Sequence, residues 1–227
     1  MPTPKALFFD VFGTCVDWRT TVAREGFGEQ FADDWRARYQ PQLETVRSGE
    51  RPWTILDVLH REALDDVLAA HDIDLPAAQR DELNLVWHRL DPWPDTVPGL
   101  TRLKERFVIA PVSNGNIALL VDMAKHAGLP WDVILGAELA RAYKPQPEAY
   151  LRSAEALGIA PGEAMMVAAH NGDLVAAAGL GLQTAFVPRP REHGPGQTSD
   201  LRAEASYDVV ATDLVDLANA LTAPIGS

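Results

Sequence analysis

The run KALFFDVF at residues 5–12 is almost continuously apolar and is broken near its end by Asp10. Four further runs share this character: FVIAPVS at 107–113, AMMVAA at 164–169, QTAFVP at 183–188 and YDVVAT at 207–212. DVILGA at 132–137 is a weaker sixth candidate. Strands that helices cover on both faces lose the alternation of polar and apolar side chains. These runs therefore predict buried parallel strands.

Helical stretches separate the later strands. NIALLVDMAKHAGL at 116–129 follows the second run, and PQPEAYLRSAEALGI at 145–159 has the Pro-rich start and trailing Gly158 that punctuate a helix. Strands alternating with helices predict an α/β fold with a doubly wound parallel sheet. The polar stretch RPREHGPGQTSD at 189–200 is expected to be a surface loop.

One connection is far longer than a crossover needs. Residues 13–106 separate the first two strands, whereas a dozen or so residues suffice to join parallel neighbours. The insert has apolar residues at three-to-four spacing and no convincing strand. We expect a helical cap domain at 16–92, a core formed by 1–15 and 93–227, and a proline-stiffened, non-helical return hinge at 91–99.

Composition excludes several classes of protein. With 47% hydrophobic and 23% charged residues among 227, the chain has the composition of a globular protein. One cysteine and no Cys/His cluster exclude a disulfide scaffold and a structural zinc domain, and favour a reducing cytoplasm. A net charge of -12 argues against nucleic acid or an anionic membrane as partner. The N-terminal apolar run is too short for a signal peptide or a membrane span.

Polar residues gather where the predicted strands end. In open α/β sheets, ligands bind beyond the carboxyl ends of the strands. Each residue alone has an ordinary structural explanation, as a turn former, a helix cap or a solvated charge. The residues expected near this edge are, in chain order, Asp10, Thr14, Ser113, Asn114, Lys144, Tyr150, His170, Asn171 and Asp173.

Four segments together resemble the motifs of the haloacid dehalogenase superfamily: FFDVFGT at 8–14, VSNGN at 112–116, YKPQPEAY at 143–150 and VAAHNGDLVAAAGLG at 167–181. The resemblance spans the chain and implies a Rossmann-like core with Asp10 as a nucleophile. Most members are magnesium-dependent phosphatases, but Phe12 stands where they have a second Asp and Ala169 where they have a metal-site carboxylate. Magnesium needs such oxygen ligands, so we expect no metal, no other cofactor and no phosphoryl transfer.

These departures resemble the L-2-haloacid dehalogenase branch, in which a carboxylate displaces halide from carbon two of a short haloacid and water hydrolyses the ester. The resemblance implies that Arg36 on the cap receives the halide, helped by Asn114, with Arg38 as the second candidate. Halide leaves as an anion, so its departure needs positive charge in a dry pocket. Phe12, Trp35 and Trp53 are expected to form an apolar wall.

The resemblance implies further roles. Thr14 steadies the nucleophile loop, and Lys144 keeps Asp10 ionised by lowering its pKa. Ser113 and backbone N–H groups near Phe12 and Gly13 hold the substrate carboxylate. Tyr150 and Asn171 complete the predicted substrate-binding set.

Ester hydrolysis is the step for which the sequence leaves alternatives open. Ala168 and His170 stand where the best-known dehalogenases have Ser and Asn. His170 is either a general base oriented by Asp173 or a passive hydrogen-bond partner beside a water that Asp173 positions. The rival functions are a phosphatase, a hydrolase that opens a strained ring beside a carboxylate, and an inert binding protein. The resemblance also favours a homodimer.

Overall fold

A six-stranded parallel sheet forms the centre of the computed structural model, which describes residues 3–223. Its strand order is β5-β4-β1-β6-β7-β8. The strands are β1 (Ala6–Phe9), β4 (Val108–Ser113), β5 (Leu135–Gly136), β6 (Ala164–Ala168), β7 (Gln183–Phe186) and β8 (Val209–Val210). Every predicted run, including the weaker sixth, contributes a strand. The strand predicted at 5–12 is shorter in the structure because β1 ends at Phe9, before Asp10.

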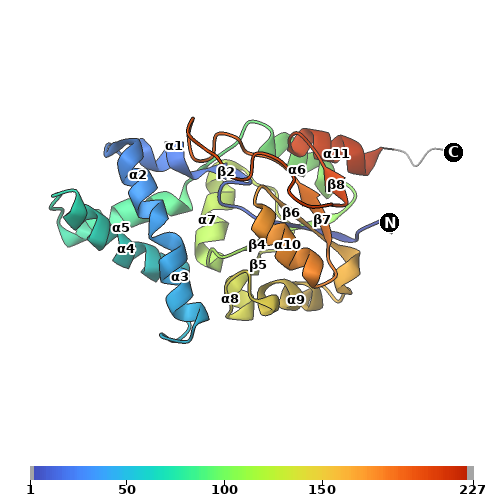
Figure 1. The fold of residues 1–227 in the computed structure, drawn as a ribbon, viewed down its shortest axis with the longest axis horizontal. Helices are drawn as coiled ribbons and strands as arrows, with labels where there is room; N and C mark the ends of the chain where they lie inside the picture. The colour runs from blue at the N-terminus through green and yellow to red at the C-terminus, as the bar shows by residue number, and fades with distance from the viewer. Residues whose placement is uncertain (1–2, 224–227) are drawn as a thin grey trace.

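Helices cover both faces of the sheet, which confirms the doubly wound fold (Figure 1). On β1, Leu7 and Phe9 pack into one apolar cluster and Ala6 and Phe8 into the other. The first cluster includes residues of α6 (Thr96–Lys104), α7 (Ile117–Ala127) and α11 (Leu214–Thr222). The second includes residues of α9 (Pro147–Ala156) and α10 (Asn171–Gly179), and the short α8 (Ala137–Ala140) packs on α9.

The insert between β1 and β4 forms a group of helices beside the sheet, at the left of Figure 1. They are α1 (Trp18–Ala23), α2 (Gly28–Ala37), α3 (Tyr39–Arg47), α4 (Leu56–Ala70), α5 (Ala77–Asn84) and the 3-10 helix η1 (Leu85–His88). They pack mainly on one another. The domain limits at 16 and 92 stay a prediction. In residues 3–223 no helix is long and apolar enough to cross a membrane.

Two details of the insert differ from the prediction. Two short strands, β2 (Val16–Asp17) and β3 (Asp91–Pro92), pair antiparallel where the chain enters and leaves it. Two-residue strands are too short to give a sequence period. Helix α6 begins at Thr96, inside the stretch predicted to be a non-helical hinge. Pro98 lies in the first turn, where a backbone N–H has no partner within the helix, so this proline is compatible with a helix.

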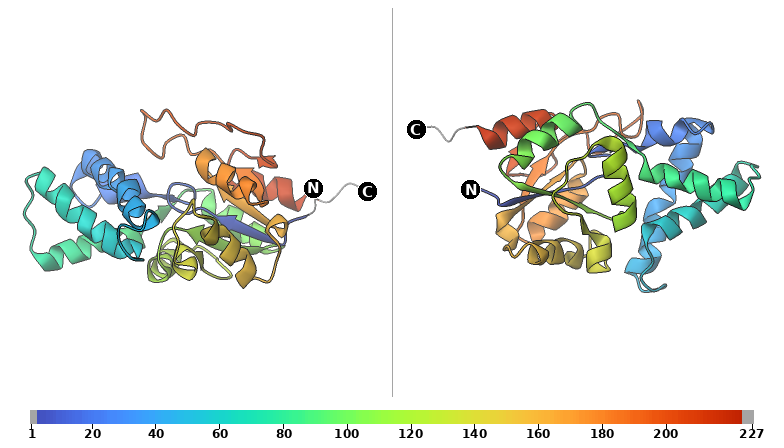
Figure 2. Two further views of the ribbon diagram at one scale, coloured as in Figure 1. Left: turned by 60° about the horizontal axis from the view of Figure 1, so that its bottom comes forward. Right: turned by 180° about the vertical axis from the view of Figure 1, so that it is seen from behind.

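The stretch at 189–200 is a loop with mostly exposed residues, as predicted, but part of it is buried. It extends from the end of β7 toward the insert, where Glu192 contacts Trp18, and then runs back over the core, where Asp200 contacts Asn171 at the start of α10 (Figure 2, left). Arg189 and Glu192 within it are buried. The Arg189 guanidinium donates to the Thr14 carbonyl at 2.8 Å and forms two hydrogen bonds of 2.7 Å to Asp95. The burial of such charged residues cannot be predicted from the sequence, because the partners that neutralise them lie far away in the chain.

His88 joins the insert to the core. Its ring nitrogens bond Asp57 on α4 at 3.0 Å and Asp122 on α7 at 2.9 Å, and Asn116 donates to Asp57 at 2.8 Å. Burial opposes protonation of this histidine, but the two carboxylate bonds outweigh burial and raise its pKa above the usual 6.5. The ring therefore ties the two parts together, and its protonation strengthens the tie.

His88→Gln tests this tie through pH. A raised pKa in the folded state means that the charged ring stabilises the fold below about pH 6.5, and that this contribution is lost as pH rises through the folded-state pKa. We expect the free energy of unfolding of the wild-type protein to exceed that of the variant by about 1.5 kcal/mol at pH 5.5, the order of one hydrogen bond to a charged group. Urea unfolding should show this advantage shrinking toward pH 9. The exposed His126→Gln is the control, and an advantage that grows with pH would contradict the assignment.

Candidate active site

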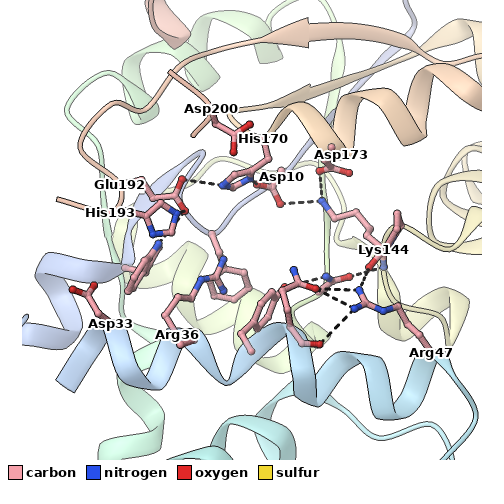
Figure 3. Close-up of a pocket in the computed structure, with 18 of the residues that line it drawn as sticks. Asp10, Asp33, Arg36, Arg47, Lys144, His170, Asp173, Glu192, His193 and Asp200 are labelled. Carbon is pink, nitrogen blue, oxygen red and sulfur yellow. Dashed lines mark hydrogen bonds and ion pairs between the residues drawn. The ribbon is translucent and has the colours of Figure 1, made fainter. Parts of the chain in front are cut away.

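A pocket of about 690 Å³ lies between the carboxyl ends of the central strands and the inserted helices (Figure 3). Strand β1 delivers Asp10, the segment after β4 delivers Asn114, and the N-terminal end of α10 delivers Asp173. This is the sheet edge at which doubly wound proteins bind ligands. The predicted site residues that line the pocket are Asp10, Phe12, Arg36, Asn114, Lys144, Tyr150, His170 and Asp173.

Asp10 contacts three side chains in the pocket and is 7% exposed. Thr14 Oγ1 donates to its Oδ2 at 2.7 Å, and His170 Nδ1 lies 3.0 Å from the same oxygen. Lys144 Nζ lies 2.9 Å from Oδ1. Burial raises the pKa of Asp10, but the Lys144 charge and the His170 hydrogen bond outweigh burial and bring it far below its usual range. Asp10 is therefore an ionised carboxylate.

Lys144 lies between two carboxylates. Its Nζ contacts Asp173 Oδ2 at 2.5 Å as well as Asp10, and Tyr150 Oη donates to Asp173 Oδ1 at 2.5 Å. The backbone N–H of Lys144 donates to Asn114 Oδ1 at 2.8 Å, which fixes the start of the lysine chain. Burial lowers the pKa of Lys144, but the two acidic neighbours raise it above its usual value. The ammonium group thus stays charged.

His170 has a carboxylate on each side. Its Nε2 lies 2.9 Å from Glu192 Oε2, opposite the bond to Asp10. Burial lowers the pKa of His170, but the Glu192 charge and the Asp10 hydrogen bond raise it well above 6.5. This direction favours the imidazolium form in the resting protein, so His170 would have to lose a proton before it could act as a base, and that role stays a prediction. Its predicted orientation by Asp173 is wrong, because Asp173 bonds Lys144 and Tyr150 while Glu192 bonds the ring.

Arg36 on α2 has a guanidinium surrounded by aromatic rings. Its Cζ lies 4.1 Å from the ring centroid of Tyr39, 5.4 Å from that of Trp18 and 5.8 Å from that of Phe12. Its Nη1 is buried and has no hydrogen-bond partner within residues 3–223. A buried cationic donor without a partner favours a small anion. Arg38, the second candidate, pairs with Asp66 at 3.3 Å on the surface.

The structure does not bring three predicted substrate-binding residues to the pocket wall. Ser113 is fully buried and its Oγ accepts from the Gly115 N–H at 3.1 Å. The Gly13 N–H donates to the Val16 carbonyl. Asn171 Nδ2 donates to Asp200 and to the Arg202 carbonyl, so it anchors the loop after residue 189. In each case the strand-end position is right, but the polar group is used within the protein.

The apolar wall also differs from the prediction. Phe12 lines the pocket, whereas Trp35 is buried in the insert and donates to the His60 carbonyl at 3.0 Å. Trp53 packs on Tyr143 with ring centroids 4.7 Å apart. Trp18 and Tyr39 take their place in the lining. Both are large aromatics in helices of the insert. The sequence does not show which side of each helix faces the pocket, because the packing of the helices decides this.

The residues present do not fit a magnesium site. Asp10 and Asp173 are the carboxylates that a metal would use, but both bond the Lys144 ammonium, which lies between them. No group of three or more His, Cys, Asp or Glu side chains within the described part of the chain is arranged to hold a metal ion. Magnesium prefers several oxygen ligands in near-octahedral array. The Lys144 ammonium group instead neutralises the two carboxylates.

Comparison with known proteins gives consistent similarities. The haloacid dehalogenase-like hydrolase model matches residues 4–181. A (S)-2-haloacid dehalogenase of Xanthobacter autotrophicus is 28% identical over 192 residues, which are 82% of this chain and 75% of the relative. A solved defluorinating L-2-haloacid dehalogenase is 52% identical, with 96% of this chain and 95% of that chain covered and a TM-score of 0.93. The Xanthobacter autotrophicus L-2-haloacid dehalogenase, solved with chloropropionic acid covalently bound, is 25% identical over 95% of this chain and 97% of that chain, with a TM-score of 0.82.

Lys144→Met tests the central ion pair. Removing the ammonium leaves two buried carboxylates without their cation, and breaking a buried pair costs about 3 kcal/mol or more. We expect this loss in urea unfolding at pH 7, with partial recovery toward pH 4 as a carboxylate takes up a proton. Lys104→Met, which removes a more exposed lysine paired with Asp132, is the control. Equal stability of Lys144→Met and wild type at pH 7 would contradict this description.

Proposed function

The chain belongs to the haloacid dehalogenase-like hydrolases, and on that basis we propose that it hydrolyses short L-2-haloalkanoic acids to 2-hydroxyalkanoic acids without a metal. This proposal rests on one observation: ionised Asp10 and the cationic Arg36 line the same pocket. Asp10 supplies an anionic oxygen, and Arg36 Nη1 is a buried donor with no hydrogen-bond partner among the described residues. Nucleophilic displacement of a leaving anion needs both groups.

The first half reaction is a displacement at carbon two. An oxygen of Asp10 forms a bond to that carbon from the side opposite the halogen, and the carbon–halogen bond breaks with its electron pair on the halide. The configuration inverts. No proton moves, so the anion needs only the positive field of Arg36 in a site lined by Phe12 and Tyr39. Asn114 lines the same pocket and assists in receiving the halide.

The second half reaction hydrolyses the aspartyl ester. Water forms a bond to Cγ of Asp10 and passes a proton to Asp173, which Tyr150 and Lys144 hold in the pocket. The bond from Cγ to the product oxygen then breaks, and that oxygen takes the proton from Asp173. The regenerated Asp10 carboxyl, now with one oxygen from water, loses its proton to solvent. Splitting one slow displacement by water into two steps is the benefit of covalent catalysis.

Two finer features of the proposal rest on the sequence. A homodimer agrees with the family resemblance, and a cytoplasmic location agrees with the single cysteine, Cys15, which is buried and free.

Which halogen the enzyme removes is a separate question. Because the relative at 52% identity is described as defluorinating, fluoroacetate belongs among the substrates to be tested beside chloroacetate and 2-chloropropionate.

Halide release in the presence of EDTA tests the reaction. We expect chloride and 2-hydroxypropionate from (S)-2-chloropropionate at a rate that EDTA leaves unchanged, and no chloride from Asp10→Asn. The product should be the R enantiomer, by chiral chromatography. Metal-dependent phosphate release without any halide release would favour the phosphatase alternative, and no turnover of either substrate would favour an inert binding protein.

Arg36→Lys tests the halide-receiving role. A lysine keeps the charge but loses the planar fork and its contacts with the rings of Tyr39 and Trp18. We expect kcat for halide release to fall about 100-fold or more, the magnitude typical for loss of a group that stabilises charge in the transition state. Arg38→Lys, on the same segment but paired with Asp66 at the surface, should retain wild-type kcat. Equal kcat for Arg36→Lys and wild type would remove Arg36 from the mechanism.

A further inference from the structure

Glu192 is a buried carboxylate for which the two half reactions above give no role. It is 1% exposed, although it lies in a long polar loop. Its Oε2 lies 2.9 Å from His170 Nε2, and its Oε1 accepts from the Trp18 indole N–H at 3.0 Å. His193 Nε2 lies 3.6 Å away. Burying a charge is costly unless it is paired, so the protein has built a specific environment for this side chain.

The nucleophile loop is shaped to admit Glu192. Gly13 has a φ of +83°, and a Cβ there would lie 2.0 Å from Glu192 Oε1. Any larger side chain at position 13 would displace the carboxylate from the ring of His170. The glycine three residues after the nucleophile and the loop at 189–200 are therefore coupled, and the Arg189 bonds to Thr14 and Asp95 hold that loop in place.

The oxygens of Asp10 are not equivalent. Oδ2 receives two hydrogen bonds, from Thr14 at 2.7 Å and His170 at 3.0 Å, whereas Oδ1 contacts Lys144 at 2.9 Å. The oxygen with fewer donors is freer to attack carbon two, which leaves Oδ2 as the carbonyl oxygen of the ester. When water adds to Cγ, the carbonyl electron pair moves onto Oδ2. Donors already aimed at that atom stabilise the charge as it forms.

We propose that Glu192 is a positioning residue that keeps His170 an imidazolium, whose Nδ1–H together with the Thr14 hydroxyl stabilises negative charge on Asp10 Oδ2 during ester hydrolysis. This inference rests on the proposed function. Forming the ester removes the charge of Asp10, one of the two anions that favour protonation of His170. Glu192 is the anion that remains against the ring.

The charges around the pair support this assignment. Burial raises the pKa of Glu192, but His170, Arg36 and His193 lower it, so the carboxylate is ionised. The titratable and charged groups that face His170 or its two partners are Asp10, Arg36, Lys144, Asp173, Glu192 and His193. Among these, Asp10 and Glu192 are the groups bonded to the ring. Loss of Glu192 therefore lowers the pKa of His170 most in the ester state.

Glu192→Gln in a rapid-quench experiment tests the inference. With excess (S)-2-chloropropionate, we expect a normal burst of one chloride per enzyme, accumulation of a propionyl adduct on the Asp10 peptide by mass spectrometry, and at least about tenfold slower steady-state turnover. The alkaline limb of kcat should move to lower pH, because activity requires protonated His170 and the variant lowers its pKa. Glu29→Gln, which removes an exposed cap carboxylate, is the matched control.

His170→Gln supplies an independent variant. Its amide N–H remains a donor that does not titrate in this range, so hydrolysis should be slow but the alkaline limb should disappear. Failure of the adduct to accumulate in Glu192→Gln would overturn the inference. An acidic limb of kcat that moves to lower pH in that variant would also overturn it, because activity that needs deprotonated His170 would make His170 a base. Absence of any halide burst in the wild-type protein would instead overturn the proposed function, and the inference with it.

Discussion

The ammonium group of Lys144, placed between the carboxylates of Asp10 and Asp173, is the interaction on which the site depends. Three segments that are distant in sequence meet at this one charge: the end of β1, the segment before α9 and the start of α10. A buried carboxylate alone would take up a proton and lose its nucleophilicity. With the lysine beside it, Asp10 remains an anion in a site that excludes much of the solvent.

The inserted helices and the loop at 189–200 close this charged edge from two sides. The insert contributes Arg36 with its aromatic surroundings, and the loop contributes Glu192 and, through Arg189, support for the nucleophile loop. The two parts also meet each other, because Trp18 of the insert donates to Glu192. In the proposed mechanism, the positive charge for the departing anion and the polar environment for the ester thus come from different segments. The arrangement separates the demands of the two half reactions in space.

The sheet was predictable because buried parallel strands give apolar runs. The ends of these runs then located Asp10, Asn114 and Asp173, because ligands bind beyond the carboxyl ends of the strands. The spacing of the motifs did not reveal which hydrogen bonds the site residues make, because tertiary packing decides those contacts. Ser113 and Asn171 lie at the predicted strand ends, but their polar groups bond within the protein. Ser113 accepts from the backbone amide of Gly115, and Asn171 donates to the loop after residue 189. Glu192 lay in a stretch whose composition is that of a surface loop. Its signal, in retrospect, is the glycine at position 13, whose missing side chain makes room for it.

Isotope transfer into the protein tests most directly whether Asp10 forms a bond to the substrate carbon. Enzyme in excess over 2-chloropropionate would complete one turnover in water enriched in oxygen-18, and the peptide that contains Asp10 would be weighed and sequenced by mass spectrometry. We expect heavy oxygen in the Asp10 carboxylate and ordinary oxygen in the hydroxyl of the product. Heavy oxygen in the product hydroxyl, with an unlabelled Asp10 peptide, would mean that water attacks the substrate directly and would contradict the proposed mechanism.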